Sequence, residues 1–150
     1  MASTKERILS ALMTHPDDWL SGDQLAQQVG ISRESVWKAV NSLRKRGHQI
    51  DSRKNRGYQY AGGQQLDALA IQIAAGSRFT GQVTVVPQTA STQFLAKQFI
   101  SQQGAPQLAA FFADEQTAGY GRLGRDFYSP AGSGLYFSLV LPNPTNDLSQ

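Results

Sequence analysis

A glycine-rich segment at residues 114–138 restricts the possible folds of this chain more than any other feature. It holds five glycines around Arg122 and Arg125, and it lies between two strand-like runs at residues 108–113 and 135–141. Glycine tolerates positive φ, so a loop of this kind can point backbone N–H groups at one anion. The arginines would add forked donors suited to carboxylate or phosphate oxygens. The segment therefore predicts a site for negatively charged groups between two strands.

Two standard nucleotide-binding loops do not fit this segment. Residues 119–124 match G-x-G-x-x-G, but that fingerprint requires a helix to open at the glycines. Pro130 and two further glycines follow instead, and they would break a helix. The Gly-Lys-Ser/Thr of a Walker loop occurs nowhere in the sequence. A hairpin loop with solvated arginines remains the alternative to an anion site.

Positive charge is concentrated in the first 60 residues. They carry ten basic and six acidic residues, a balance of +4, whereas residues 61–150 carry four basic and five acidic residues, a balance of −1. Eight of the ten basic residues lie between Arg33 and Arg56. Such a concentration is typical of a phosphate-binding face, although charge alone fits a solvated surface equally well.

The pattern of apolar residues decides between these two interpretations, because it predicts a winged helix-turn-helix. A first helix ends near His15, and a capping box at Ser21 begins a second helix. Gly30 makes the turn, and Ser32 caps a third helix. Two strand-like pieces follow, and the segment between them, residues 54–57, favours a tight reversal with cations at its tip.

The exposed face of the third helix and the tip of the wing are the predicted contacts with DNA. Trp37, at the border of that face, is expected to pack against the wing rather than to stack on a base. The candidate DNA-binding residues are Ser32, Arg33, Glu34, Lys38, Asn41, Lys45, Lys54 and Arg56.

A linker at residues 62–65 is expected to separate a DNA-binding domain, residues 1–61, from a second domain, residues 66–150. The second domain should begin with a short helix, followed by a strand that Pro87 ends and by a helix capped by Ser91. With the strands beside the glycine-rich segment, these elements predict an α+β fold.

Several classes of protein are excluded by composition. The sequence has no cysteine, and both histidines lie in the first domain, so the second domain can hold neither a Ser-His-Asp triad nor a histidine metal site. No metal-ligating residues are predicted. No stretch of 18 apolar residues and no signal peptide is evident, so we expect a soluble cytoplasmic protein without membrane contact.

The glycine-rich segment resembles the biotin-binding signature of the biotin–protein ligases, GRGRxGRxWxSP followed by LYxS. This chain has GYGRLGRDFYSPAGSGLYFS, and upstream Ala90-Ser91-Thr92-Gln93 is similar to the family's D/E-S-T-N. Tyr120 stands for an arginine, Phe127 for a tryptophan, Gln93 for an asparagine and Ala90 for an acidic residue. With the winged helix in front, the chain resembles the bifunctional ligases that also repress biotin genes.

The resemblance implies a fold, a reaction and its partners. The second domain would be the first part of a class II synthetase-like α/β catalytic domain, truncated, because the family's KWPND-like segment is not in the sequence. The whole enzyme would use biotin, ATP and Mg²⁺ to form biotinyl-5′-adenylate. It would then transfer the biotinyl group to a lysine of the biotin carrier protein of acetyl-CoA or pyruvate carboxylase. The liganded, full-length protein would bind the biotin operator as a homodimer.

The family likeness also assigns roles within the site. Arg122 is the expected catalytic residue, which would hold the carboxylate or phosphate. The expected biotin- and adenylate-binding residues are Ser91, Thr92, Gln93, Gln116, Gly119, Tyr120, Gly121, Arg122, Arg125 and Phe127. Two alternatives stay open: a regulator that only senses biotin or its adenylate, and a related lipoate ligase or octanoyltransferase.

Overall fold

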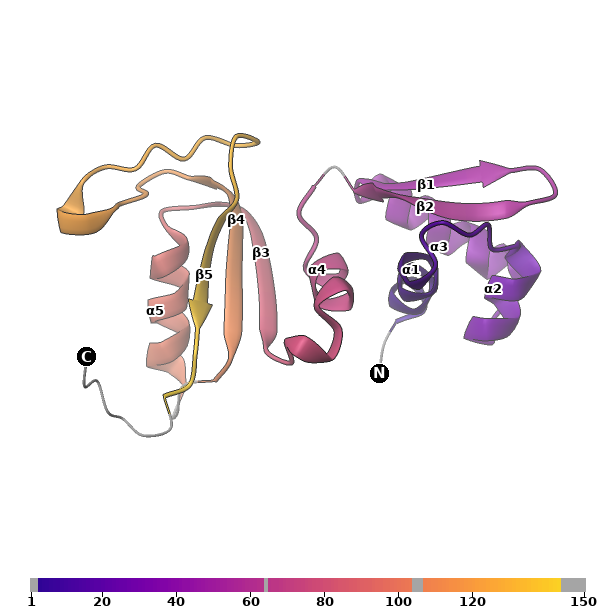
Figure 1. Ribbon diagram of the computed structural model, residues 1–150, viewed down its shortest axis with the longest axis horizontal. Coiled ribbons are helices and arrows are strands. Elements are labelled where there is room, and N and C mark those ends of the chain that lie inside the picture. Colours follow the sequence, from indigo (N-terminus) through magenta and orange to yellow (C-terminus); the bar gives the residue numbers. More distant parts are fainter. Residues whose placement is uncertain (1–2, 64, 104–106, 144–150) are drawn as a thin grey trace. The chain divides into compact units, whose positions relative to one another are not determined.

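The computed structural model describes residues 3–63, 65–103 and 107–143 and divides the chain into two compact units, Met1–Ala74 and Ala75–Gln150. The first unit is mainly helical with one hairpin, and the second packs a helix on a small sheet (Figure 1). The expected α+β class is therefore confirmed, and the helix-turn-helix is N-terminal in the sequence.

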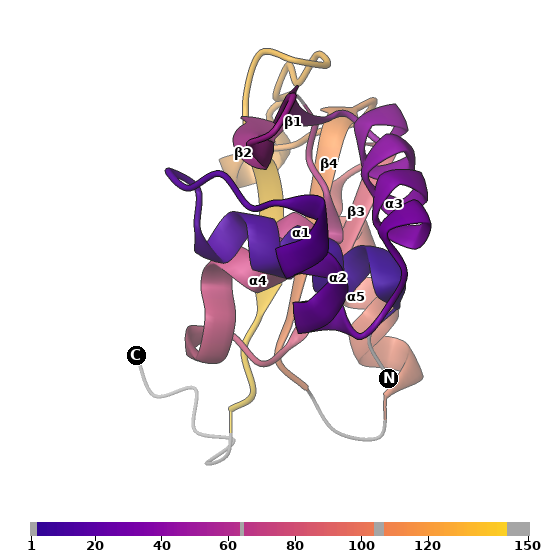
Figure 2. The same cartoon turned by 90° about the vertical axis from the view of Figure 1, so that its right-hand side faces the viewer.

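Three helices and a hairpin form the first unit, as the sequence predicts (Figure 2). Their bounds are α1 (Thr4–Thr14), α2 (Gly22–Val29), α3 (Arg33–Lys45), β1 (His48–Arg53) and β2 (Gly57–Gly63). Complete capping boxes begin α1 at Ser3 and α2 at Ser21, and the Ser32 side chain accepts the Ser35 N–H at the start of α3.

The hairpin β1–β2 is antiparallel and extends by one bridge into the connection between α1 and α2. Leu20 and Tyr58 exchange two backbone hydrogen bonds of 2.8 Å. Gly57, at φ 103°, makes this approach possible, because a Cβ at Gly57 would lie 2.1 Å from the Leu20 carbonyl oxygen. The wing is thus fixed to the helical part by backbone contacts.

A helix after the hairpin completes the core of the first unit. α4 (Ala68–Ala75) packs Leu69 and Ile73 against the buried side chains of α1, α2 and α3. The boundary between the units therefore falls between Ala74 and Ala75, later than the linker predicted at residues 62–65. Glycine composition suggested that linker, but Gly62 and Gly63 lie within β2.

The second unit consists of a three-stranded sheet with one helix across it (Figure 1). Its elements are the short 3-10 helices η1 (Gly76–Arg78) and η2 (Arg122–Gly124), β3 (Gln82–Thr89), α5 (Thr92–Gln102), β4 (Ala109–Gln116) and β5 (Tyr136–Val140). β3 pairs with β4 in parallel, and β4 pairs with β5 antiparallel. The parallel pair brings the end of β4 beside the start of α5, which positions the site described below.

One expected strand end is wrong. Pro87 lies inside β3, which continues to Thr89, instead of ending the strand. β3 is an edge strand of the sheet and pairs only with β4 among the described strands. A proline is tolerated on an edge strand because its missing N–H need not bond to a neighbour. The expected helix end at Gly104 lies outside the described residues; α5 ends at Gln102.

The two faces of this sheet differ. On one face, Phe111 of β4 packs against Phe99 of α5, with ring centroids 5.4 Å apart. On the other face, Phe112 stacks on Phe137 at 5.6 Å, and Phe137 remains 49% exposed. None of the described helices is long and apolar enough to cross a membrane.

Candidate functional site

A cavity of about 320 Å³ lies where β4, β5, the start of α5 and the glycine-rich connection meet. Its lining combines polar groups with apolar walls: Ser91, Thr92, Gln93, Gln116, Tyr120, Gly121, Phe127, Leu135, Tyr136, Phe137 and Ser138. Seven of the predicted biotin- and adenylate-binding residues are among them. The structure thus brings together residues that are far apart in the sequence.

The amide of Gln116 is held at both ends. Its Oε1 accepts hydrogen bonds from Thr92 N at 2.9 Å and from Thr92 Oγ1 at 3.2 Å, and its Nε2 donates to Ser129 Oγ at 3.0 Å. The backbone N–H of Thr92 can only donate, so the amide has one orientation. Among the described residues, Ser129 Oγ is the one acceptor found for Nε2. Thr92 Oγ1 also lies 2.9 Å from Ser138 Oγ, which adds a further hydroxyl to this polar group.

Ser138 is a site residue that the sequence did not single out. Its position is the serine of LYxS, so the motif carried the signal, but no role was assigned to it. Only the strand pairing reveals its position at the cavity, because it sets Ser138 of β5 opposite Phe111 of β4 and within reach of Thr92.

Gly119 does not line the cavity but packs inside the glycine-rich connection. The glycine-rich connection folds back on itself: Phe127 N donates to Gly119 O and Gly121 N donates to Arg125 O, both at 2.8 Å. A Cβ at Gly119 would lie 2.7 Å from Phe127 O and 2.8 Å from Ser129 Oγ. A side chain at this position would therefore force apart the two arms of the connection.

The two arginines of the connection are exposed. Neither Arg122 nor Arg125 lines the cavity, and within the described residues neither side chain has an ion-pair or hydrogen-bond partner. The structure keeps both guanidinium groups free for an anion and does not place them against the polar group at Gln116. Their roles stay predictions.

A lysine accompanies Tyr120, which stands where the family signature has an arginine. Lys97 of α5 donates from Nζ to Tyr120 Oη at 3.1 Å, and Nζ lies 5.7 Å from the centre of the tyrosine ring. The ammonium group of Lys97 therefore supplies a positive charge beside Tyr120, which lines the cavity.

On the first unit, a hollow of about 640 Å³ separates α3 from the wing. Arg33 and Trp37 of α3 line it on one side, and Arg53 and Lys54 line it on the other. Trp37 remains 57% exposed, so it is not the packing residue that the sequence predicted. A second hollow along α3 is lined by Trp37, Lys38, Asn41, Ser42, Arg44 and Lys45. The predicted DNA-binding residues therefore lie along α3 and the wing tip, with Ser32 at the N-cap of α3.

The eight basic residues between Arg33 and Arg56 fall into three groups. Arg44 and Arg46 maintain the fold, since Arg44 donates to the Ile50 carbonyl and Arg46 pairs with Asp67. Two cations of α3 have exposed acidic partners: Arg33 pairs with Asp23 at 3.1 Å and Lys38 pairs with Glu34 at 2.6 Å. The other four, Lys45, Arg53, Lys54 and Arg56, have no side-chain hydrogen bond or acidic partner among the described residues.

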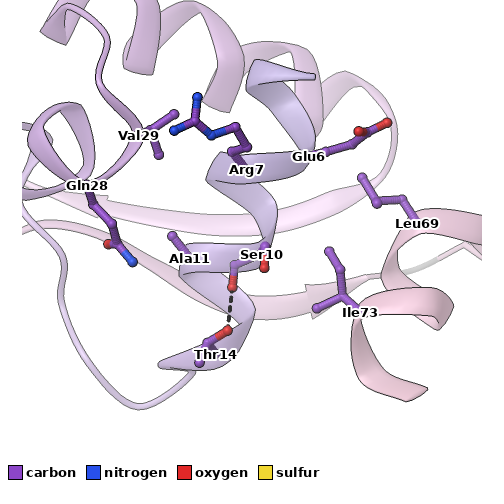
Figure 3. Close-up of a pocket in the computed structure, with 9 residues that line it drawn as sticks. All are labelled: Glu6, Arg7, Ser10, Ala11, Thr14, Gln28, Val29, Leu69 and Ile73. Carbon is purple, nitrogen blue, oxygen red and sulfur yellow. Dashed lines mark hydrogen bonds between the residues drawn. The ribbon is translucent and has the colours of Figure 1, made fainter. Parts of the chain in front are cut away.

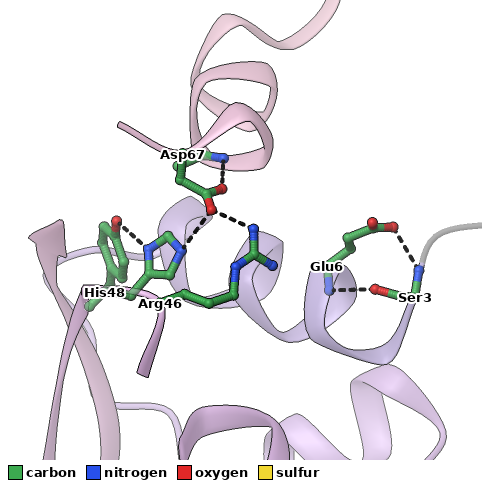
Figure 4. Close-up of polar contacts among 7 residues, drawn as sticks. Ser3, Glu6, Arg46, His48 and Asp67 are labelled. Carbon is green, nitrogen blue, oxygen red and sulfur yellow. Dashed lines mark hydrogen bonds and ion pairs between the residues drawn. The ribbon is translucent and has the colours of Figure 1, made fainter. Parts of the chain in front are cut away.

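Asp67 joins the end of α3 to the start of α4 (Figure 4). Its Oδ1 accepts the Ala70 N–H at 3.0 Å, and its Oδ2 lies 3.7 Å from Nε2 of the buried His48. Burial would raise the pKa of Asp67, but the Ala70 hydrogen bond and the charges of Arg46 and His48 together hold it below 3.8. For His48, burial is the largest effect and lowers the pKa below 6.5 against the attraction of Asp67. These groups stabilise the first unit and lie apart from the predicted sites.

Docking of α4 also leaves a hollow of about 390 Å³ against α1 and α2 (Figure 3). Its apolar wall comes from Ala11, Val29, Leu69 and Ile73, and Glu6 at its rim is held by the capping box with Ser3. None of the predicted site residues lines it.

Known protein families match both units. Residues 4–59 match the HTH domain family, and residues 85–150 match the Biotin/lipoate A/B protein ligase family. Over most of its length the chain is similar to proteins named bifunctional ligase/repressor BirA. The bifunctional ligase/repressor BirA of Bacillus subtilis (strain 168) is 29% identical over 143 residues, which cover 94% of this chain and 44% of the relative.

Two further relatives show the same similarity. The BirA proteins of Escherichia coli (strain K12) and Salmonella typhimurium (strain LT2) are 33% and 35% identical over 120 and 121 residues. These segments cover 79% of this chain and 36% of each relative. The chain thus spans less than half the length of the BirA relatives that it matches.

Proposed function

We propose that the protein carrying this chain is a biotin–protein ligase that also represses transcription from the biotin operator. It would activate biotin with ATP to biotinyl-5′-adenylate and transfer the biotinyl group to a carrier-protein lysine. The observation that carries the ligase part is the polar group of Thr92, Gln116 and Ser138 in a cavity with apolar walls. Such a lining fits biotin, whose ureido ring has one carbonyl and two N–H groups beside an apolar bicycle.

The same polar group favours biotin over lipoate. A dithiolane ring has no N–H or carbonyl group, so it would form no strong hydrogen bond with the polar group of Thr92, Gln116 and Ser138, whereas a ureido ring could. Hydrogen-bonding pockets discriminate strongly against such substrates. This supports a biotin-specific site within a family that also includes lipoate ligases.

The chemistry needs positioning and charge neutralisation rather than a protein nucleophile. A carboxylate must approach the α-phosphate of ATP, and the two anions repel each other in water. Arg122, Arg125 and the Lys97–Tyr120 pair are the cations available beside the cavity. Mg²⁺ would neutralise ATP phosphates. No cluster of three or more His, Cys, Asp or Glu side chains that could hold a metal occurs among the described residues, so we assign the ion no protein ligand.

The DNA-binding proposal rests on the winged helix and on its cations that have no acidic partner among the described residues. Lys45, Lys54 and Arg56 would contact phosphates, while Asn41 of α3 would contact a base edge. Sensing of biotin or its adenylate without ligation is the competing proposal. We also propose that the full-length protein is a homodimer, because a two-fold operator would require two winged helices. Its proposed location is the cytoplasm.

Biotin-dependent exchange of pyrophosphate into ATP by the full-length protein tests the ligase. Thr92→Val and Gln116→Leu should abolish biotin binding, whereas Gln98→Leu, on the exposed side of α5, should not. Exchange with lipoate but not biotin would reject the proposal. Binding without exchange would favour the sensor.

A further inference from the structure

Two arginines of the wing lie over one tryptophan ring. Arg53 Cζ is 4.9 Å and Arg56 Cζ is 5.5 Å from the centre of the Trp19 ring. Trp19 belongs to the connection between α1 and α2, whereas both arginines belong to the wing tip. Neither Trp19 nor Arg53 was among the predicted DNA-binding residues.

Backbone and side-chain contacts hold the connection against the wing. Beyond the Leu20–Tyr58 bridge, Gln59 Nε2 donates to Pro16 O at 3.3 Å. The ring therefore keeps a fixed position beside the wing tip. The tip itself closes through Arg56 N, which donates to Arg53 O at 3.1 Å, so the two arginines start from neighbouring points.

The donors of both arginines are free. Within the described residues, neither side chain forms an ion pair or hydrogen bond, in contrast to Arg44 and Arg46. Asp18, the residue before Trp19, has its Oδ2 3.8 Å from His15 Nδ1 and forms no ion pair with either arginine.

We propose that Trp19 is a platform that holds Arg53 and Arg56 together to bind phosphates of duplex DNA. A guanidinium stacked on a ring keeps its N–H donors in plane and directed past the ring edge. Restricting the two side chains beforehand also lowers the entropy lost when they bind phosphate. Trp19 is thus a positioning residue. This inference rests on the proposed DNA binding and deepens it.

Anisotropy of labelled duplex DNA with the 150-residue chain, measured across KCl concentrations, tests the platform. Arg53→Ala with Arg56→Ala should lower the salt slope by about 1.8, since each lost phosphate contact removes about 0.9. Trp19→Leu should weaken binding about 5-fold at an almost unchanged slope, because both charges remain. Trp19→Phe should restore most of the affinity, because it keeps a ring. As a matched control, Lys5→Ala with Arg7→Ala removes two charges from α1 and should affect binding less.

The decisive comparison adds Trp19→Leu to the double arginine variant. The platform predicts no further loss there, whereas a merely structural role predicts the same loss in both backgrounds. Equal loss in both backgrounds, or a Trp19→Phe variant that binds as weakly as Trp19→Leu, would overturn the platform.

If the unsubstituted chain binds no duplex DNA at low salt, the DNA-binding proposal itself fails. If Trp19→Leu prevents folding, two other variants test the platform. Trp19→Phe should bind DNA almost as tightly as the unsubstituted chain. Arg53→Lys with Arg56→Lys should bind more weakly at an unchanged salt slope, since lysines keep the charges and lose the forked donors.

Discussion

Oδ2 of Asp67 lies 2.5 Å from Nη2 of Arg46, and this ion pair ties the end of α3 to the start of α4. Asp67 also caps α4 through Ala70. One side chain therefore performs two tasks, and both fix a helix that the sequence assigned to the other domain.

Substitutions at Asp67 should separate these two tasks. Asp67→Asn keeps a good N-cap but removes the charge, so it should destabilise the first unit by about 1 kcal/mol at neutral pH. Asp67→Ala loses the cap as well and should cost about 1 kcal/mol more. Urea unfolding, followed by tryptophan fluorescence, measures both. Because the pKa of Asp67 is held below 3.8, its charge contributes above that pH and is lost as pH falls through the lowered pKa. Equal stability of all three proteins would show that α4 is not anchored there.

His48 should make the same unit sensitive to mild acid. Burial lowers the pKa of His48 below 6.5, so the unfolded chain binds more protons than the folded one as pH falls below that value. The free energy of unfolding should therefore be full above pH 6.5 and decrease below it. Urea titrations at pH 7.5 and 5.5 measure the decrease, which His48→Gln should reduce. His15→Gln, on an exposed side chain, is the control and should leave the decrease unchanged.

The sequence predicted the winged helix well because its signals are local. Caps at Ser21 and Ser32 and the apolar spacing of three helices depend on residues within a few positions of one another. The structure places α4 with the first unit rather than the second, because its position depends on contacts of Leu69, Ile73 and Asp67 with residues far away in the sequence. Glycine composition could not supply that information.

The sequence predicted many of the residues that line the cavity but not their geometry. Motif resemblance identified Thr92 and Gln116, and the structure joins them by hydrogen bonds. Ser138 and Lys97 required the strand register and the helix packing. The positions of Arg122 and Arg125 relative to a ligand remain predictions, since both side chains are exposed.

Gly119 should not tolerate even a methyl group. Gly119→Ala would place Cβ against Phe127 O and Ser129 Oγ, so the connection must open, at a cost of about 1–3 kcal/mol. Gly121→Ala is a matched control, because its nearest contact would be an ordinary 3.8 Å to Arg125 O. Hydrogen exchange of the Phe127 amide, which bonds to Gly119 O, measures the opening. Similar protection in both variants would contradict the crowding seen at Gly119.

Removing one negative charge from α3 should strengthen binding to DNA. Glu34 holds Lys38 Nζ at 2.6 Å, so Glu34→Gln frees a cation on the face proposed to meet phosphates. The affinity for duplexes of any sequence should rise, and the salt slope should increase by about 0.9 if Lys38 gains one contact. Glu6→Gln, on α1, carries the same change of charge and serves as the control. An unchanged or weaker affinity would mean that Glu34 itself contacts DNA favourably, for example at a cytosine amino group.

Arg122 is the sharpest test of the glycine-rich connection. Its side chain is exposed and has no partner among the described residues, so Arg122→Gly should change the free energy of unfolding by less than about 0.5 kcal/mol. In the full-length protein, the same change should slow adenylate formation by about 10²–10³-fold, the usual effect of losing one donor to a developing anion. Quenched-flow measurement of biotinyl-adenylate determines that rate, and Arg78→Gly, on η1, is the control for loss of an arginine. Normal adenylate formation by Arg122→Gly would remove Arg122 from the catalytic site. The Lys97–Tyr120 pair would then be the leading cation beside the cavity.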